Sequence, residues 1–205
     1  MAEPAVKSRR RLRPDERIQE ILDAAAELVV ETGIAQLNME KIARRAGVSK
    51  GLLYAYFPNV KTLLQEVLLR EHRKLQRAQL DAITSAVDFE SMAKSTAHNN
   101  HVQRTERGLL VERLRGDPEV AGRMVDVDRK SREGVIDYLT GQVTMHFAIP
   151  EQIARLATSL IIGPGQGNLH FAPGPVEDMD EIWGAMMVGA MKELERRFGG
   201  GNANE

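Results

Sequence analysis

Apolar residues recur at spacings of three and four along most of this 205-residue chain. That period places them on one side of an α-helix, because a helix completes a turn in 3.6 residues. The first such stripe is formed by Ile18, Ile21, Leu22, Ala25, Leu28 and Val29. Pro14 suits the first turn of this helix, and Gly33 suits its end. Aromatic residues make up only 4% of the chain, which disfavours a sandwich or barrel of short strands. We therefore expect an all-α fold.

Two short helices joined by a tight turn are predicted next. Asn38 is a favourable N-cap for the first of them, and Ser49 is one for the second. Gly47 lies between them and accepts the left-handed backbone conformation that other residues resist. The small side chains of Ala43 and Ala46 allow the two helices to cross closely. This arrangement is a helix-turn-helix pattern.

The second short helix is predicted to have an inward and an outward side. Its anchors to the rest of the fold are expected to be Val48, Leu53 and Phe57. The residues left to face outward are Lys50, Gly51, Leu52, Tyr54 and Tyr56. A lysine reaches a guanine edge or a phosphate, a tyrosine hydroxyl donates to phosphate, and a leucine meets a thymine methyl. A glycine removes a side chain where the backbone must approach the duplex. The outward side is therefore suited to DNA.

Charge is divided unevenly along the chain. The whole sequence holds 28 basic and 29 acidic residues, a net charge of −1, which excludes binding of nucleic acid through bulk positive charge. Residues 1–61 nevertheless hold eleven basic and eight acidic residues, a local charge of +3 that leaves −4 for the remainder. A basic N-terminal part favours a polyanion as partner, although an ordinary solvated surface is the alternative.

Several classes of protein are excluded or disfavoured by residue types. The chain has no cysteine, so disulfide scaffolds, thiolate zinc sites and thiol catalysis are ruled out. The longest uncharged stretch, 156–176, contains three prolines and is not expected to span a membrane. Residues 1–13 have basic residues but no apolar run behind them, so no secretory signal is expected there.

The rest of the chain is predicted to continue as helices. We expect them at about 60 to the mid-80s, 89–101, 106–115, 119–145, 150–163 and 176–198. The predicted organisation is a disordered basic arm (1–13), a helix-turn-helix domain (14–60, with the motif at about 38–57), a helical domain (61–198) and a disordered tail (199–205).

The segment 17–64 resembles the TetR family of bacterial transcriptional regulators. The matching residues are the run IARRAGVSKGLLYAYFPN and the preceding amphipathic helix with its Thr32-Gly33 end. Two positions differ from the common family pattern. Asn38 stands where threonine is common, and Val60 stands where lysine is common, with Lys61 one residue later.

The resemblance implies a cytoplasmic bacterial regulator with an N-terminal DNA-binding domain and a C-terminal ligand-binding and dimerisation domain. We expect a repressor that binds a palindromic operator as a homodimer and is released by a small-molecule effector. The expected DNA contacts are Asn38, Arg44, Ser49, Lys50, Gly51, Leu52, Tyr54, Tyr56 and Lys61. Neither a cofactor nor a metal ion is expected.

The C-terminal third is expected to form the dimer interface. Residues 182–191 (IWGAMMVGAM) are apolar or small on every side, so this helix must be buried all round. One side can meet its own domain, and the other needs a second copy; a thick monomeric core is the alternative. The expected interface residues are Leu160, Ile161, Trp183, Met187 and Met191. Candidate ligand-binding residues, chosen by polarity and position, are His98, His101, Met124, Tyr138, Gln142, Phe147 and Phe171.

Parts of the sequence are also compatible with two other functions, a metal-dependent enzyme and a DNA-compacting protein. His98 and His101 share a helix face as metal ligands of an enzyme would, but no nearby acid completes a set of ligands. The glycine-rich run 163–167 lacks the spacing of a dinucleotide-binding loop, and no nucleotide-binding or hydrolase motif is present. A protein that compacts DNA without sequence preference would use the same N-terminal domain, so it remains the main alternative.

Overall fold

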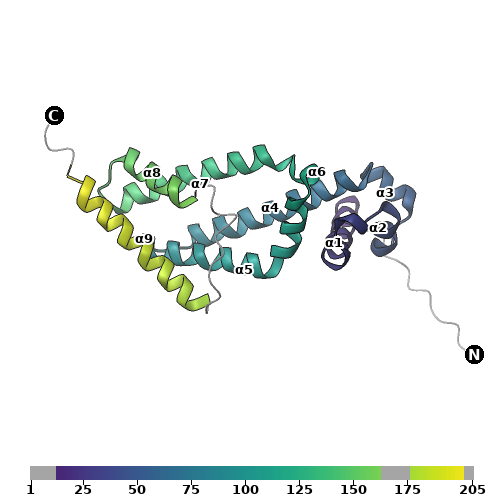
Figure 1. The fold of residues 1–205 in the computed structure, drawn as a ribbon, viewed down its shortest axis with the longest axis horizontal. Coiled ribbons are helices and arrows are strands. Elements are labelled where there is room, and N and C mark those ends of the chain that lie inside the picture. Colours follow the sequence, from purple (N-terminus) through teal and green to yellow (C-terminus); the bar gives the residue numbers. More distant parts are fainter. Residues whose placement is uncertain (1–12, 163–175, 201–205) are drawn as a thin grey trace, which may run out of the picture. The chain divides into compact units, whose positions relative to one another are not determined.

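The computed structural model describes residues 13–162 and 176–200, and within these ranges it contains helices and turns but no strand (Figure 1). The described residues divide into two compact units. The first comprises the chain up to Arg70 together with Leu109–Ala121, and the second comprises Glu71–Gly108 with the chain from Gly122 onward. Two helices, α4 (Val60–Thr84) and α5 (Phe89–Gly116), contribute residues to both units.

The first unit contains the predicted helix-turn-helix. Its elements are α1 (Pro14–Thr32), a 3-10 turn η1 (Ile34–Gln36), α2 (Met39–Ala46), α3 (Lys50–Tyr56), the first part of α4, the end of α5 and α6 (Pro118–Ala121). As expected, Pro14 is the first residue of α1, and Gly33 ends that helix with a φ of 76°. The turn η1 was not predicted.

The core of the first unit is built from helix faces that carry apolar residues at helical spacing. Fully or almost fully buried side chains come from each main helix of this unit: Ile21, Ala25 and Val29 of α1, Ile42 of α2, Leu53 of α3, and Leu63, Leu64 and Val67 of α4. A seven-residue helix such as α3 is too short to be stable alone in water. Its position therefore depends on this shared core.

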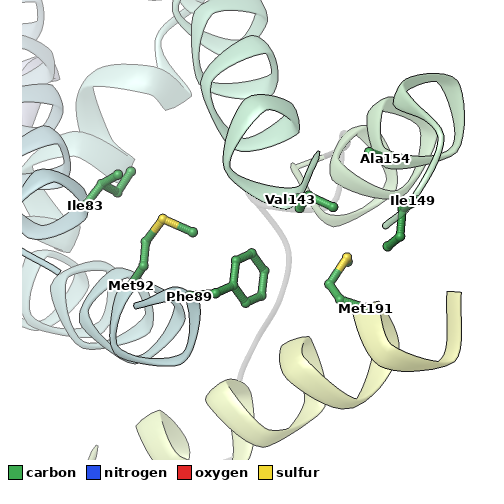
Figure 2. Packing of buried hydrophobic residues seen from close by; sticks show 7 residues of the cluster. All are labelled: Ile83, Phe89, Met92, Val143, Ile149, Ala154 and Met191. Carbon is green, nitrogen blue, oxygen red and sulfur yellow. The ribbon is translucent and has the colours of Figure 1, made fainter. Parts of the chain in front are cut away.

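The second unit is a helical domain around a separate core. Its elements are the rest of α4 and α5, α7 (Met124–His146), α8 (Glu151–Ile162) and α9 (Val176–Phe198). Figure 2 shows the cluster at its centre, which is formed by Ile83, Phe89, Met92, Val143, Ile149, Ala154 and Met191. Phe147 packs edge-on against Phe89, with ring centres 5.1 Å apart. The cluster joins α4, α5, α7, α8 and α9.

Polar contacts between buried groups also join α7 to α8, which lie side by side (Figure 1). The hydroxyls of Thr140 and Thr158 are 2.9 Å apart, so one donates to the other, and each also lies within hydrogen-bond distance of a carbonyl oxygen of its own helix. Hydroxyl pairs of this kind can be buried because both groups have hydrogen-bond partners.

Two of the predicted helix boundaries were wrong. The helices expected at 89–101 and 106–115 form one continuous helix, α5, because the four residues between them include neither glycine nor proline. The helix expected at 119–145 is instead divided into α6 and α7, with the break at Gly122 and Arg123. Glycine is a poor helix former, which favours a break there.

None of the described helices is both long enough and apolar enough to cross a bilayer. Residues 1–12, 163–175 and 201–205 lie outside the described residues, and with them lie almost all of the predicted arm and most of the predicted tail.

Candidate nucleic-acid interface

The turn between α2 and α3 is closed by backbone hydrogen bonds. Gly47 has φ 64° and ψ 30°, in the left-handed region that was predicted for it. Its N–H donates to the carbonyl of Arg44 (3.3 Å), and the N–H of Val48 donates to that of Ala43 (3.0 Å). This pair of bonds is the Schellman arrangement, which satisfies carbonyls that a helix end leaves open. The turn therefore sets the direction in which α3 leaves α2.

Side-chain caps fix the starts of three successive helices. The Asn38 side chain accepts from the N–H of Lys41 (2.9 Å), and Ser49 Oγ accepts from the N–H of Leu52 (3.2 Å). Both caps were predicted. A third, in which Asn59 Oδ1 accepts from the N–H of Thr62 (2.8 Å), starts α4 and was not predicted. Each cap satisfies a backbone donor that has no partner within its helix.

Helix α3 separates its anchoring residues from its outward ones. Leu53 is completely buried and Phe57 is 5% exposed, whereas the Lys50 side chain is 60% exposed and Tyr54 is 47% exposed. Gly51 is also exposed, and a Cβ built at that position would meet nothing within 4 Å. Packing within the chain therefore does not require glycine there. Helix α3 thus presents an open, largely polar surface to an external partner.

Two of the predicted outward residues are less open than expected. Leu52 and Tyr56 are half-buried. Tyr56 lines a shallow hollow of about 290 Å³ whose other walls are Ile18, Leu22, Phe57, Thr62 and Glu66. The aromatic ring of Tyr56 is therefore partly engaged within the unit.

The cations near α3 differ in their availability. Arg45 donates to Glu27 (3.1 Å) and to Glu31 (2.8 Å), both on α1, and these hydrogen bonds raise its pKa. The same contact lowers the pKa of Glu31. Arg45 therefore ties α2 to α1, while the neighbouring Arg44 is exposed. Lys50 Nζ lies 4.0 Å from a carboxylate oxygen of Glu40, a weak contact that leaves the lysine accessible.

Residues 21–67 match the model of the family described as "Bacterial regulatory proteins, tetR family". The chain is 37% identical over 62 residues to the HTH-type transcriptional regulator SrpR of Pseudomonas putida, covering 30% of this chain and 29% of SrpR. It is 39% identical over 87 residues to the HTH-type transcriptional activator FasR of Mycolicibacterium smegmatis, covering 42% of this chain and 40% of FasR. The matches thus span less than half the length of these curated relatives.

The fold resembles that of a solved protein over almost the whole chain. A solved structure of a TetR-like transcriptional regulator from Rhodococcus sp. RHA1 superposes with a TM-score of 0.65 at 18% identity, covering 89% of this chain and 99% of that one. The match to the tetR family is carried by residues 21–67. The fold of the chain is that of a TetR-like protein, with an N-terminal helix-turn-helix domain followed by a helical domain.

The candidate ligand-binding residues differ in their burial and in their contacts. His98 Nδ1 is 2.8 Å from a carboxylate oxygen of Asp180 on α9, and Phe147 packs against the core of the second unit. Met124 is buried, Tyr138 is exposed, and Gln142 is half-buried. His101 and Phe171 are named among the candidates, but their side chains lie outside the described part of the chain. The described residues include no group of three or more histidine or acidic side chains placed to hold a metal ion.

The candidate interface residues also differ in exposure. Leu160 is 84% exposed, whereas Met191 is 1% exposed and belongs to the cluster in Figure 2. Ile161 and Met187 are partly buried against that cluster, and Trp183 is half-buried. Met191 therefore packs inside its own chain, because the inner face of α9 is used by the core.

Two contacts between distant parts of the sequence were missed. The Arg113 guanidinium donates to the carbonyls of Val29 and Val30, each at 2.6 Å, at the C-terminal end of α1. Helix α1 has no basic residue in its own last turn, so Arg113 supplies the positive charge that a helix C-terminus favours. Lys61 Nζ lies 3.5 Å from Glu119 of α6. No local pattern predicts either contact, because the partners are more than fifty residues apart.

Proposed function

We propose that this chain is a DNA-binding regulator of transcription that recognises a palindromic duplex as a homodimer and leaves it when a small molecule binds. The proposal depends on the difference in burial between the two sides of α3. Its anchors Leu53 and Phe57 are buried, while Lys50, Gly51 and Tyr54 are exposed. A second helix of a helix-turn-helix that is fixed on one side and open on the other suits the major groove.

Residues around α3 are assigned roles by their chemistry. Lys50 and Leu52 are proposed to contact base edges, because lysine donates to guanine and an aliphatic group meets the thymine methyl. The proposed backbone contacts, which position the helix without reading sequence, are Asn38, Arg44, Ser49, Tyr54, Tyr56 and Lys61. Gly51 is proposed to allow close approach of α3 to the duplex. The proposed domain division at 60/61 follows the helix-turn-helix motif, and the compact unit around it also includes residues 61–70 and 109–121.

Exposed apolar side chains on the last two described helices support the dimer. Leu156 (56% exposed) and Leu160 (84%) are four residues apart on α8, and Ile182 (58%) and Met186 (57%) are four apart on α9. Residues four apart share a helix face. Apolar pairs exposed to water on two helices favour burial against a second copy of the chain. Within this proposal, Leu160 lies at the interface and Met191 supports it from inside.

Repression and release by an effector complete the proposal. Relatives include both a protein named regulator and one named activator, so the direction of regulation needs a transcription assay. A small, largely apolar molecule is the proposed effector because the second unit offers apolar and aromatic residues with a few polar groups. A location in the bacterial cytoplasm follows from this proposal, since the DNA is there.

The test begins with selection of bound duplexes from a random library by purified protein. We expect enrichment of a near-palindrome with half-sites about one or more helical turns apart. The variant Lys50→Ala should lose roughly 1–3 kcal/mol of discrimination at one base pair of each half-site. Tyr54→Phe should weaken all sequences alike. A library that returns no enriched sequence despite tight binding would instead support the DNA-compacting alternative.

The effector is tested by linkage. Candidate apolar molecules are titrated into the protein with and without the selected duplex. A coupling of roughly 1–3 kcal/mol would weaken ligand binding 5–150-fold when DNA is present, because the coupling acts equally in both directions. Equal affinities would contradict release by that molecule.

A further inference from the structure

Lys61 is engaged by an acidic side chain of the same unit. Its Nζ lies 3.5 Å from Glu119 Oε2, with the two side chains 49% and 73% exposed. Lys61 is the second residue of α4, whose start is capped by Asn59. The cation proposed to reach a DNA phosphate therefore already has an anionic neighbour.

Glu119 is held in this place by its backbone. Gln65, one turn after Lys61 on α4, donates from its side-chain amide to the carbonyl oxygen of Glu119 (2.8 Å). On the other side, the N–H of Glu119 donates to Asp117 Oδ1 (2.9 Å), as does the N–H of Val120 (3.2 Å). Hydrogen bonds to both the N–H and the C=O of Glu119 therefore hold its backbone in place, and its carboxylate lies beside Lys61.

We propose that Glu119 competes with the DNA backbone for Lys61, so that the segment Leu109–Ala121 sets the affinity of the DNA-binding unit. This inference rests on the function proposed above. A lysine ammonium acts as a point charge and binds a carboxylate or a phosphate by the same attraction. When a phosphate approaches, Lys61 must leave Glu119 or share its charge with it. Glu119 therefore lowers the net gain from that phosphate contact.

A regulatory consequence follows from the placement of Gln65. The bond from Gln65 to the Glu119 backbone joins α4 directly to α6. A shift of α6 large enough to break that bond separates the Glu119 carboxylate from Lys61 and frees the lysine for DNA. Within this unit, the position of α6 relative to the start of α4 thus determines whether Lys61 is available to a DNA phosphate.

The test is a double-mutant cycle on DNA binding. The probe is a duplex of random sequence, since phosphate contacts do not depend on sequence. The variants are Glu119→Gln, Lys61→Gln and the double variant. The matched control is Glu112→Gln, which removes the same charge from the other glutamate of Leu109–Ala121. Circular dichroism checks that each variant is folded.

Glu119→Gln is expected to tighten binding about two- to fivefold per DNA-binding unit at low salt, the range of an exposed ion pair. In the Lys61→Gln background its effect should fall to that of Glu112→Gln. Lys61→Gln should reduce the slope of log affinity against log salt by about 0.9 per unit, as loss of one phosphate contact predicts. Glu112→Gln measures the general effect of removing a negative charge and should change affinity less than Glu119→Gln.

Two results would overturn the inference while leaving the proposed function intact. One is an equal effect of Glu119→Gln with and without Lys61, which would show only general charge repulsion. The other is tight DNA binding that Glu119→Gln leaves unchanged. If the wild-type chain binds no duplex at all, random or selected, the proposed function fails and the inference fails with it.

Discussion

Leu53 and Tyr54 are neighbours on a seven-residue helix, yet their replacement by alanine should have opposite consequences. Leu53 is completely buried, so Leu53→Ala removes its apolar contacts and leaves a cavity. Substitutions of this type cost about 2–5 kcal/mol. Tyr54 is 47% exposed, so Tyr54→Ala should change the free energy of unfolding by less than about 0.5 kcal/mol. It should nevertheless weaken DNA binding.

Hydrogen exchange of backbone amides measures these effects separately in the two units. The only tryptophan, Trp183, lies in the second unit, so its fluorescence does not report directly on the first. In Leu53→Ala, the most protected amides of α1 and α2 should exchange roughly 30- to 5,000-fold faster, which is 2–5 kcal/mol at 1.36 kcal/mol per factor of ten. Amides of α7 and α8 serve as the internal reference.

The reasoning would be refuted by either of two outcomes. If Leu53→Ala leaves the α1 and α2 amides within threefold of wild type, α3 is not held by that side chain. If Tyr54→Ala accelerates exchange as much as Leu53→Ala does, Tyr54 has a structural role that its exposure does not reveal.

Three further outcomes are expected. Gly47→Ala should lower the unfolding free energy by about 1–2 kcal/mol, seen as a lower denaturant midpoint, because Gly47 has a positive φ; an unchanged midpoint would contradict this. Leu160→Asp should give a folded monomer by light scattering, while Met191→Asp should unfold the chain, since one side chain is 84% and the other 1% exposed; a dimeric Leu160→Asp would place the interface elsewhere. Hydrogen bonds from the two arginines of the last turn of α9 lower the pKa of Glu193 from 4.5 to about 2, so its contribution to stability is complete above pH 4.5 and is lost as the pH falls towards 2. Glu193→Gln should remove that part of the pH dependence of unfolding, and identical pH profiles would argue against it.

Local chemistry explains which parts of this fold could be predicted from the sequence. The caps at Asn38 and Ser49 and the turn at Gly47 depend on residues within a few positions, and all three were confirmed. The buried anchors of α3 could also be predicted, because their spacing places them on one helix face. The fold class followed from the same helical period.

Contacts between distant segments could not be predicted in this way. Arg113 reaches a helix end more than eighty residues earlier, and Lys61 meets Glu119 only because α4 and α6 come together. The limits of α5 were also wrong, because two helices were predicted where one continues through residues 102–105, which include neither glycine nor proline. The burial of Met191 in its own core depended on which face of α9 the other helices cover. In each case the deciding partner belongs to another helix.

The open surface around Gly51 bears on how such a protein can diverge. A side chain added there would meet no atom of its own chain within 4 Å, and the outward neighbours Lys50 and Tyr54 contribute little to the core. Substitutions at these positions therefore carry a small stability cost, because most of the folding contribution of α3 comes from its inward residues. After gene duplication, one copy could acquire a different target site through single substitutions on this face while its DNA-binding unit stays folded at every step. Substitution of the buried anchors of α3 would destabilise the unit. New specificities are therefore expected to arise by substitution of the outward residues of α3 and not of its anchors.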